Sequence, residues 1–316
     1  MPYDAAPRGQ WWRLFELTCY GGAMRAEIEK AVELLREGDD DSMGQALELL
    51  QNTVFSFSMR VCGHRQDAED TMQEVLLKSV PQLPKFDSPK ALVVWLYKVA
   101  KTRCLMNRRK SKFAPAHELS LEELMPDRKE LEQLSTDGRV NPEAFAIRSE
   151  QASRLREAVQ RLPPQYRIVL VLRDMEGLAD DEVAEITGVR AGTVRVRLHR
   201  ARLFVRKELM RTWMQEDGRK TGESRRKQLP RPARCKTMFA ELSDYLDEQL
   251  DDSLCEELEH HIEECGPCQV FVATLQATIE HCRKPGMEAS APSTAKLRLE
   301  LVQQYGRARA ALKAKS

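Results

Sequence analysis

Residues 178–209 constrain the fold more than any other stretch, because they have the pattern of two helices joined by a tight turn. Val183 and Ile186 give the first helix an apolar stripe, and Gly188 can adopt the left-handed conformation that ends a helix. The second helix has an inward face of apolar residues at helical spacing: Val194, Leu198, Ala201 and Val205. This pattern predicts a helix-turn-helix whose second helix enters the major groove of DNA.

The polar surface of the second helix predicts a DNA-binding face. Arginines dominate it, and almost no acidic residue offsets them. The alternative interpretation is an ordinary amphipathic helix with a solvated basic face. The residues that we expect to contact duplex DNA are Arg190, Thr193, Arg195, Arg197, His199, Arg200 and Arg202.

The composition limits the class of protein. The 316 residues should form two or three domains, and helical periodicity with little β-branched alternation predicts an all-α fold. The net charge is +1, so any attraction to nucleic acid must come from local segregation of charge. The chain has no membrane-spanning stretch and no signal-peptide pattern, which predicts a cytoplasmic protein. Eight cysteines in such a protein argue against a disulfide framework and favour metal or redox chemistry.

Residues 45–113 hold an acidic helix followed by a basic one. The stretch R-Q-D-A-E-D-T-M-Q-E-V-L-L-K (65–78) carries the polar side chains Asp67, Glu69, Asp70, Gln73 and Glu74. Taken alone, it is an acidic first turn favoured by the helix dipole, followed by a solvated face. Residues 91–112 interleave aromatic residues with cations, which suits single-stranded DNA, although a basic and soluble helix end would look the same. Its candidate DNA contacts are Lys98, Lys101, Arg103 and Arg108.

The C-terminal third carries a metal-ligand pattern. Within H-H-I-E-E-C-G-P-C (260–268), His261 lies one helical turn before Cys265, and the Cys-Gly-Pro-Cys knuckle can direct the thiolates of Cys265 and Cys268 at one ion. A fourth soft ligand would complete a tetrahedral zinc site. Cys235 is the best candidate, with Cys255 and His260 as alternatives. The competing interpretation is a redox pair or two buried thiols.

Two of these segments resemble a known family. The string G-T-V-R-V-R-L-H-R-A-R (192–202) after E-G-L-A-D-D-E-V-A-E-I (176–186) resembles region 4 of the extracytoplasmic-function (ECF) sigma factors of bacterial RNA polymerase. The D-A-E-D-x-x-Q-E and W-L-Y-K-V-A strings resemble region 2. The resemblance implies that region 4 reads the −35 promoter element and that region 2 reads and melts the −10 element. It also implies that the acidic face of region 2 grips the β′ clamp helices of core RNA polymerase, with the β flap as a further contact. Ala179 stands where the family has a capping serine, so Asp180 is the candidate N-cap.

The cysteine-rich end is similar to a second family. The spacing C-x25-H-x3-C-x2-C, from Cys235 to Cys268, resembles the zinc-binding anti-sigma domain. The resemblance implies that its helices wedge between regions 2 and 4 and that residues 296–311 supply a last docking helix. Residues 240–270 hold eleven acidic residues and no lysine or arginine, so charge also favours an intramolecular contact with the basic sigma regions.

These observations predict a modular chain. Its expected parts are an N-terminal extension (1–44), sigma region 2 (45–113), a linker (114–148), sigma region 4 (149–213), a basic linker (214–233), a small helical zinc-binding domain (234–284) and a C-terminal tail helix (285–316). The predicted protein is a promoter-specific initiation factor with a zinc-dependent domain in cis, and not an enzyme, because four ligands would close the metal site. The alternative is a helix-turn-helix repressor with a metal sensor that acts without polymerase.

Overall fold

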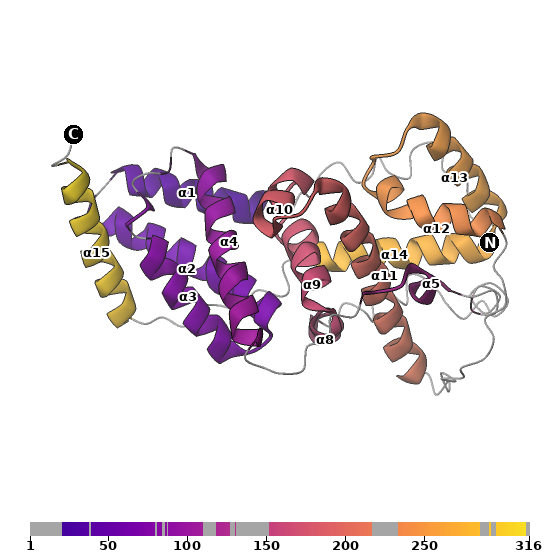
Figure 1. Cartoon of the computed structure of the whole chain (residues 1–316), viewed down its shortest axis with the longest axis horizontal. Helices are drawn as coiled ribbons and strands as arrows, with labels where there is room; N and C mark the ends of the chain where they lie inside the picture. Colours follow the sequence, from indigo (N-terminus) through magenta and orange to yellow (C-terminus); the bar gives the residue numbers. More distant parts are fainter. Residues whose placement is uncertain are drawn as a thin grey trace, which may run out of the picture.

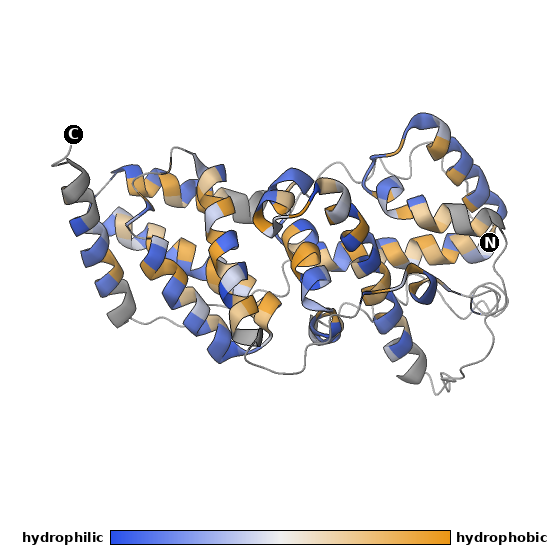
Figure 2. Cartoon of the chain, in the orientation of Figure 1, coloured by the Kyte–Doolittle hydropathy of each residue, from blue (hydrophilic) through white to orange (hydrophobic). Residues whose placement is uncertain are grey.

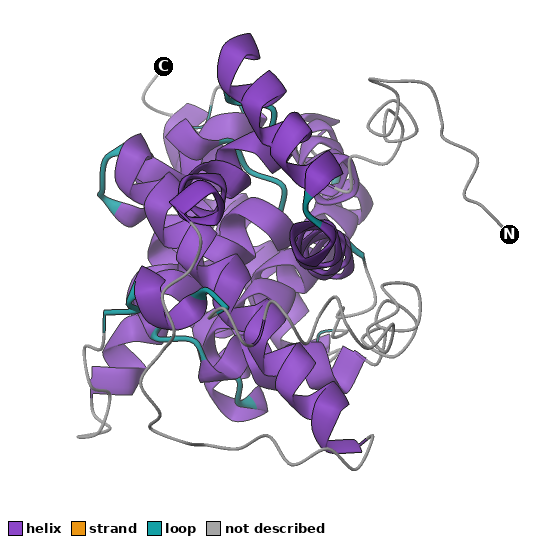
Figure 3. Ribbon diagram, turned by 90° about the vertical axis from the view of Figure 1, so that its right-hand side faces the viewer, coloured by secondary structure: helices purple, strands orange, loops and turns teal. Residues whose placement is uncertain are grey.

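The computed structural model describes residues 21–37, 39–79, 81–83, 86, 88–109, 118–126, 130, 152–216, 233–284, 291 and 295–313. All regular secondary structure within these ranges is helical, which confirms the predicted all-α class (Figure 3). The predicted linkers lie mostly outside the described residues, as does the start of the predicted N-terminal extension. The described helices form three units along the long axis of the molecule (Figure 1).

The first unit, here called the N-terminal bundle, packs four helices together: α1 (Gly21–Glu37), α2 (Asp40–Cys62), α3 (Arg65–Ser79) and α4 (Pro89–Arg109). The carboxylate of Asp39 caps α2 by accepting from the N–H groups of Asp41 and Ser42, at 3.0 and 2.9 Å. Gly63, at φ 79°, ends the same helix. The predicted boundary at 44/45 is wrong for the helical unit, because it cuts α2 and separates α1 from the bundle that it helps to build.

The second unit, here called the central unit, contains the predicted helix-turn-helix. Its helices are α8 (Ala152–Arg161), α9 (Pro164–Leu170), the π-helical turn η3 (Val171–Met175), α10 (Asp180–Thr187) and α11 (Ala191–Glu216). Gly188 ends α10 at φ 74°, as its position in the sequence predicts. Asp180 is not the N-cap: it begins α10 and pairs with Arg173 at 2.9 Å, while the Glu182 carboxylate accepts from the N–H of Ala179. Short helix α5 (Leu121–Leu124), inside the predicted linker, packs on α11.

The third unit, here called the Cys/His unit, consists of α12 (Ala233–Leu246), α13 (Asp252–Glu264) and α14 (Gly266–Arg283). Helices α12 and α14 pack on α11, and α14 also contacts η3. The last helix, α15 (Ala295–Lys313), lies at the other end of the molecule on α2 and α3 (Figure 1). The apolar sides of these helices turn toward one another, with the hydrophilic sides outward (Figure 2).

The arrangement differs from the wedge that the anti-sigma resemblance implies. The N-terminal bundle and the central unit pack directly on each other, through α4 with α10 and α2 with α8 and α9. The Cys/His unit sits on the far side of the central unit (Figure 1). The tail helix α15 instead reaches the N-terminal bundle, where Leu301 and Tyr305 are buried. Of the helices that the structure describes, none combines the length and apolar character needed to cross a bilayer.

Candidate metal centre and nucleic-acid interface

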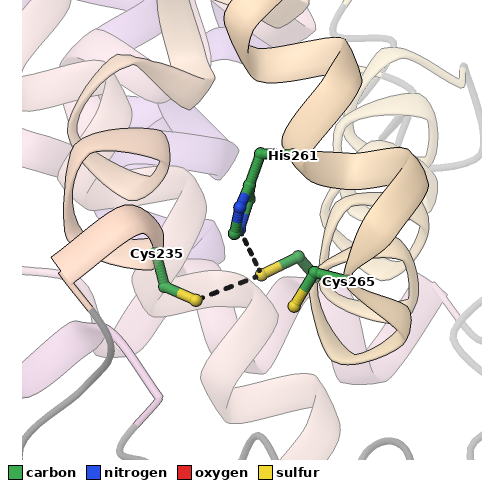
Figure 4. Close-up of side chains that lie close together, drawn as sticks. Cys235, His261 and Cys265 are labelled. Atoms are coloured by element: carbon green, nitrogen blue, oxygen red, sulfur yellow. Dashed lines mark hydrogen bonds between the residues drawn. The ribbon is translucent and has the colours of Figure 1, made fainter.

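Four side chains from three helices of the Cys/His unit converge on one point. Cys235 lies in the first turn of α12, His261 near the end of α13, and Cys265 between α13 and α14 (Figure 4). Cys268 follows in the first turn of α14. Their ligand atoms all lie within 4.8 Å of one another. The predicted set of four is therefore the set that the fold brings together.

The knuckle between α13 and α14 explains how two thiols face one point. Cys265 is extended, at φ −120° and ψ 92°, which breaks the helix and turns the chain. Pro267 then occupies the first turn of α14, where its missing N–H costs nothing. The carbonyl of Cys265 accepts from the N–H of Cys268 at 2.9 Å, which closes the knuckle. This local geometry depends only on the four residues Cys-Gly-Pro-Cys, so it could be read from the sequence.

The spacing of the donor atoms fits a tetrahedral soft metal ion. Two sulfurs at about 2.3 Å from one zinc ion would lie about 3.8 Å apart, and a sulfur and a nitrogen about 3.6 Å apart. The Sγ atoms of Cys235 and Cys268 are separated by 3.7 Å, and His261 Nε2 lies 3.3 Å from Cys268 Sγ. Burial raises the pKa of the Cys235 and Cys268 thiols, so a bound cation is what would stabilise their thiolates. The donor set and its geometry suit a metal ion.

The two alternative ligands lie outside this cluster. His260 is exposed and faces the Glu264 carboxylate at 3.3 Å. Cys255 is half-buried earlier on α13 and does not belong to the group of four. Since the four predicted residues already supply four ligands, neither alternative is needed to complete a tetrahedral site.

The DNA-binding residues predicted on α11 fall into two groups. Arg190 and Arg195 are exposed, and Thr193, Arg197 and Arg200 are half-buried, so these five line the outer surface at the start of the helix. Arg202 and His199 are buried, with only 1% and 7% of their surfaces exposed. The assignment of these last two residues to the DNA face is wrong for this conformation, because the Cys/His unit and the core of the central unit enclose them.

Arg202 is held by carboxylates from two units. Its guanidinium pairs with Asp174 of η3 through two hydrogen bonds, at 2.6 and 2.8 Å. It also pairs with Asp247, just beyond α12, at 2.6 and 2.9 Å, and donates to the Ser243 hydroxyl at 2.9 Å. Burial opposes ionisation of Asp174, but the adjacent Arg202 keeps its pKa below the usual range. Arg202 thus links α11 to the Cys/His unit.

His199 lies against α12 in the same contact. Burial lowers the pKa of its imidazole to about 4, and the neighbouring Arg202 and Arg200 lower it further, so the ring is neutral at pH 7. Sequence spacing placed this residue on the polar side of α11, and the packing of a second unit on that side could not be read from helical periodicity.

Arg206 completes this contact and was not predicted as a functional residue. Its guanidinium lies 3.7 Å from the centre of the Phe271 ring and donates to the Thr274 hydroxyl at 2.8 Å, both on α14. Phe271 in turn packs edge-on against Phe239 of α12, with ring centroids 4.8 Å apart. Burial lowers the pKa of Arg206 to about 9. Its place in the basic run of the sequence gave no sign of this role.

The basic surface predicted on α4 is partly engaged. Lys98 is exposed, but Lys101 donates to the backbone carbonyl of Ile186 on α10 at 2.6 Å. Arg103 pairs with Glu74 of α3 at 2.6 Å. The side chain of Arg108 lies outside the described residues. Two of the four predicted contacts therefore have protein partners in this conformation.

The predicted polymerase-binding residues share the outer face of α3. Asp70 and Gln73 are exposed, and Asp67, Glu69 and Glu74 are half-buried. The opposite face of α3 is buried in the bundle through Ala68, Thr71, Met72, Val75, Leu76 and Ser79. The predicted alternation of an acidic outer face and an apolar inner face is present.

Comparisons with known proteins agree with this architecture. Three protein-family models match the chain: "Sigma-70 region 2" over residues 47–113, "Sigma-70, region 4" over 152–205, and "Putative zinc-finger" over 235–269. The three segments fall in the N-terminal bundle, the central unit and the Cys/His unit, respectively.

Several characterised proteins are similar to the first two units. The ECF RNA polymerase sigma factor SigW of Bacillus subtilis is 28% identical over 187 residues, which cover 59% of this chain and 98% of that protein. The ECF RNA polymerase sigma factor SigE of Mycolicibacterium smegmatis is 30% identical over 173 residues, covering 54% and 63%. The RNA polymerase sigma-H factor of Pseudomonas aeruginosa is 27% identical over 187 residues, covering 57% and 93%.

Proposed function

The chain belongs to the sigma-70 family, with regions 2 and 4 of the ECF type and a C-terminal zinc-finger unit, and on this basis we propose how its parts act together. It is an initiation factor that works with RNA polymerase in transcription. Sigma factors of this family are not enzymes, so we assign no reaction to the Cys/His cluster. A repressor that acts without polymerase would have no use for region 2, and the match to region 2 disfavours that alternative.

We assign the polymerase and promoter contacts to exposed and half-buried residues of the predicted faces. In this proposal, α3 binds the β′ clamp helices through Asp70, Gln73 and Glu74, and Lys98 and its neighbours on α4 bind the −10 strand. The start of α11 binds the −35 duplex through Arg190, Arg195 and Arg197, since the first residues of a recognition helix reach the base edges. Such a protein would work in the cytoplasm, where its polymerase is.

The metal that the site would hold is zinc. Three thiolates and one imidazole form a closed tetrahedral set of the structural kind, and zinc bound there would fix α12, α13 and α14 to one another. A unit of about fifty residues buries little apolar surface by itself, so much of its folding free energy would come from metal binding.

Helices α12 and α14 carry ligands of the metal site, and the same two helices cover α11. Phe239 lies one turn after Cys235 on α12, and Phe271 lies one turn after Cys268 on α14. These two rings pack on each other and support Arg206, while Asp247 holds Arg202. We propose that zinc keeps the Cys/His unit folded on region 4, and that loss of the metal or oxidation of its thiolates releases α11.

The burial of Arg202 is the observation that carries this proposal. A helix can lie in the major groove only when its flanks are open to the phosphates on both sides. Here Asp247 and the rest of the Cys/His unit cover one flank of α11 and bring acidic groups to it. Phosphates would be repelled from that flank, so the covered form should not bind the −35 element.

Run-off transcription with core polymerase tests the proposal. We would compare the full chain with a chain that ends at Glu216, the last residue of α11, on promoters obtained by selection in vitro. The short chain should initiate, and the full chain should remain silent until zinc is chelated or its thiols are oxidised. If the zinc-loaded full chain initiates and the short chain does not, the Cys/His unit activates initiation instead. Silence of both chains would contradict the assignment to initiation.

A further inference from the structure

A second contact holds region 4 in place, and it involves no residue of the Cys/His unit. The carboxylate of Glu176, at the end of η3, enters the N-terminal bundle and receives two hydrogen bonds. Arg60 of α2 donates to Oε1 at 2.6 Å, and the Tyr97 hydroxyl of α4 donates to Oε2 at 2.7 Å. The Glu176 side chain is fully buried, and that of Arg60 is 4% exposed.

Backbone groups extend the contact on one side of this ion pair. The side-chain amide of Gln160 donates to the Arg60 carbonyl at 2.7 Å, and Arg167 donates to the Val61 carbonyl at 2.8 Å. Both acceptors belong to the last turn of α2, whose carbonyls have no partner within the helix. Gly63, which ends α2, lies against the Gln160 side chain. The end of α2 is therefore shaped to receive the central unit.

The other side of the contact lies along α4. Lys90 faces two carboxylates of α10, Asp181 at 3.5 Å and Glu182 at 3.6 Å. About three turns further on, Lys101 donates to the Ile186 carbonyl at 2.6 Å. Lys101 is one of the residues assigned to −10 DNA, so α10 occupies part of the surface that this DNA would need.

A buried ion pair across a contact differs from one inside a core. The cost of burying Glu176 and Arg60 is offset only while both are present in good geometry. If one partner is neutralised, the two surfaces can separate and water can solvate the charge that is left. Disruption of this pair should therefore open the contact without unfolding either unit.

We propose that region 4 docks directly on region 2 as a competitor of promoter DNA, forming a lock that is separate from the zinc-dependent cover. The proposal rests on the function assigned above to α4. In the docked form, Lys101 binds Ile186 instead of phosphate, and regions 2 and 4 are held together instead of being spread along a promoter. Release of α11 by the Cys/His unit would then leave a second contact, which core polymerase and promoter DNA must open.

Two substitutions in the zinc-loaded full chain test this lock. Glu176→Gln removes the charge at the centre, and Lys90→Glu places a third carboxylate against Asp181 and Glu182 at the exposed rim. Glu185→Gln is the matched control, because Glu185 is an exposed acid on the same helix α10. Lys90 is half exposed, so its variant keeps the proposal testable if Glu176→Gln fails to fold.

Two readouts report the opening without polymerase or DNA. The first is the radius of gyration from small-angle X-ray scattering, which should rise for both test variants and stay unchanged for Glu185→Gln. The second is acetylation of Lys101 by an N-hydroxysuccinimide ester, followed by mass spectrometry, with exposed Lys98 on the same helix as the internal reference. Lys101 should react roughly tenfold faster in Glu176→Gln, since hydrogen bonds to a charged group are worth about a decade or more in an equilibrium constant.

Binding of a labelled single-stranded DNA of random sequence, twenty nucleotides long, then tests the competition. We expect roughly tenfold tighter binding by Glu176→Gln than by Glu185→Gln. A folded Lys90→Glu variant with unchanged size and unchanged Lys101 reactivity would overturn the lock. Opening without a gain in DNA affinity would overturn the competition. Because the first two readouts need no transcription, a chain that opens as expected but never initiates would contradict only the proposed function.

Discussion

The two faces of region 4 are held by contacts of different kinds. The face toward the Cys/His unit buries Arg202, which keeps its bidentate partner Asp174 inside the central unit whether or not Asp247 is present. The face toward the N-terminal bundle buries Glu176, whose two partners, Arg60 and Tyr97, both belong to the other unit. The first contact can therefore open without leaving a buried charge in region 4, and the second opens only by returning its charges to water.

The two contacts also differ in what stabilises the units that form them. The first depends on helices that a four-ligand site joins, and the second lies between two bundles with apolar cores of their own. A signal that acts on the metal or on its thiolate ligands thus reaches only one side of region 4 directly. The response of this chain to metal and its ability to bind a promoter therefore need separate measurements.

Removal of the metal should have the largest effect of all these changes. It should act only on the contact between region 4 and the Cys/His unit. Cys268→Ser, or a strong chelator, should abolish zinc binding and unfold the Cys/His unit, because structural zinc sites contribute on the order of 10 kcal/mol to such units. Circular dichroism should show loss of helix, and metal analysis loss of zinc. The acetylation rate of Lys101 should stay low, since the contact of α10 with α4 does not involve the metal site.

The control for this prediction is Cys255→Ser, which removes a half-buried thiol of α13 outside the cluster. It should retain the metal and the helix content. A rise in Lys101 reactivity on chelation would show that the two contacts are coupled, and would erase the contrast between them.

Asp247→Asn should loosen the first contact to a smaller extent. The change weakens two hydrogen bonds to Arg202, each to a charged group, and we expect a loss of about 2 kcal/mol from the closed form. Arg202 still pairs with Asp174, and Arg283 still lies near the Asp174 carboxylate, so region 4 should stay folded. Amide hydrogen exchange in α12 should quicken about thirtyfold. Glu256→Gln, on the exposed side of α13, should leave the exchange unchanged.

Acid should open the first contact through His199. Its pKa is lowered to about 4 by burial and would return to about 6.5 in the open form, so the open form binds more protons between these values. Stability of the closed form is therefore complete above pH 7 and falls as the pH drops through 6.5. At pH 5.5 the loss should be about 1.4 kcal/mol.

The measurement is hydrogen exchange in α12 at pH 7.5 and 5.5, corrected for the intrinsic pH dependence of exchange. His199→Asn is the reference, because protonation of the metal ligands affects both chains equally. Identical pH profiles for the two chains would exclude His199 as the responsible group.

Sequence patterns predicted what depends on local spacing. The four metal ligands, the apolar face of α11 and the acidic face of α3 follow from helical periodicity and from a knuckle of four residues, and these need no knowledge of the neighbouring units. The boundary at 44/45 does not follow the helices, because Asp39 caps α2 and this helix runs through the boundary.

Contacts between units were beyond the same reasoning. Arg202, Arg206 and His199 have the spacing of a solvated or DNA-binding face, and only the position of α12 and α14 turns that face into an interior. Glu176 likewise looks like a surface residue before a turn, and its partner Arg60 lies 116 residues earlier in the chain. The resemblance to a wedge-forming domain also misled, since the order of units in space is set by these long-range pairs.

Tyr97→Phe should have the smallest effect and gives the sharpest test of the second contact. The substitution removes one hydroxyl and keeps the ring, which packs against Phe57 with centroids 4.7 Å apart. Glu176 loses one of its two donors but retains Arg60, so the closed form should lose about 1 kcal/mol. We expect Lys101 acetylation to quicken about fivefold, with zinc content and exchange in α12 unchanged. If α12 exchange also quickened, the two faces of region 4 would open together, and the chain would have one lock in place of two.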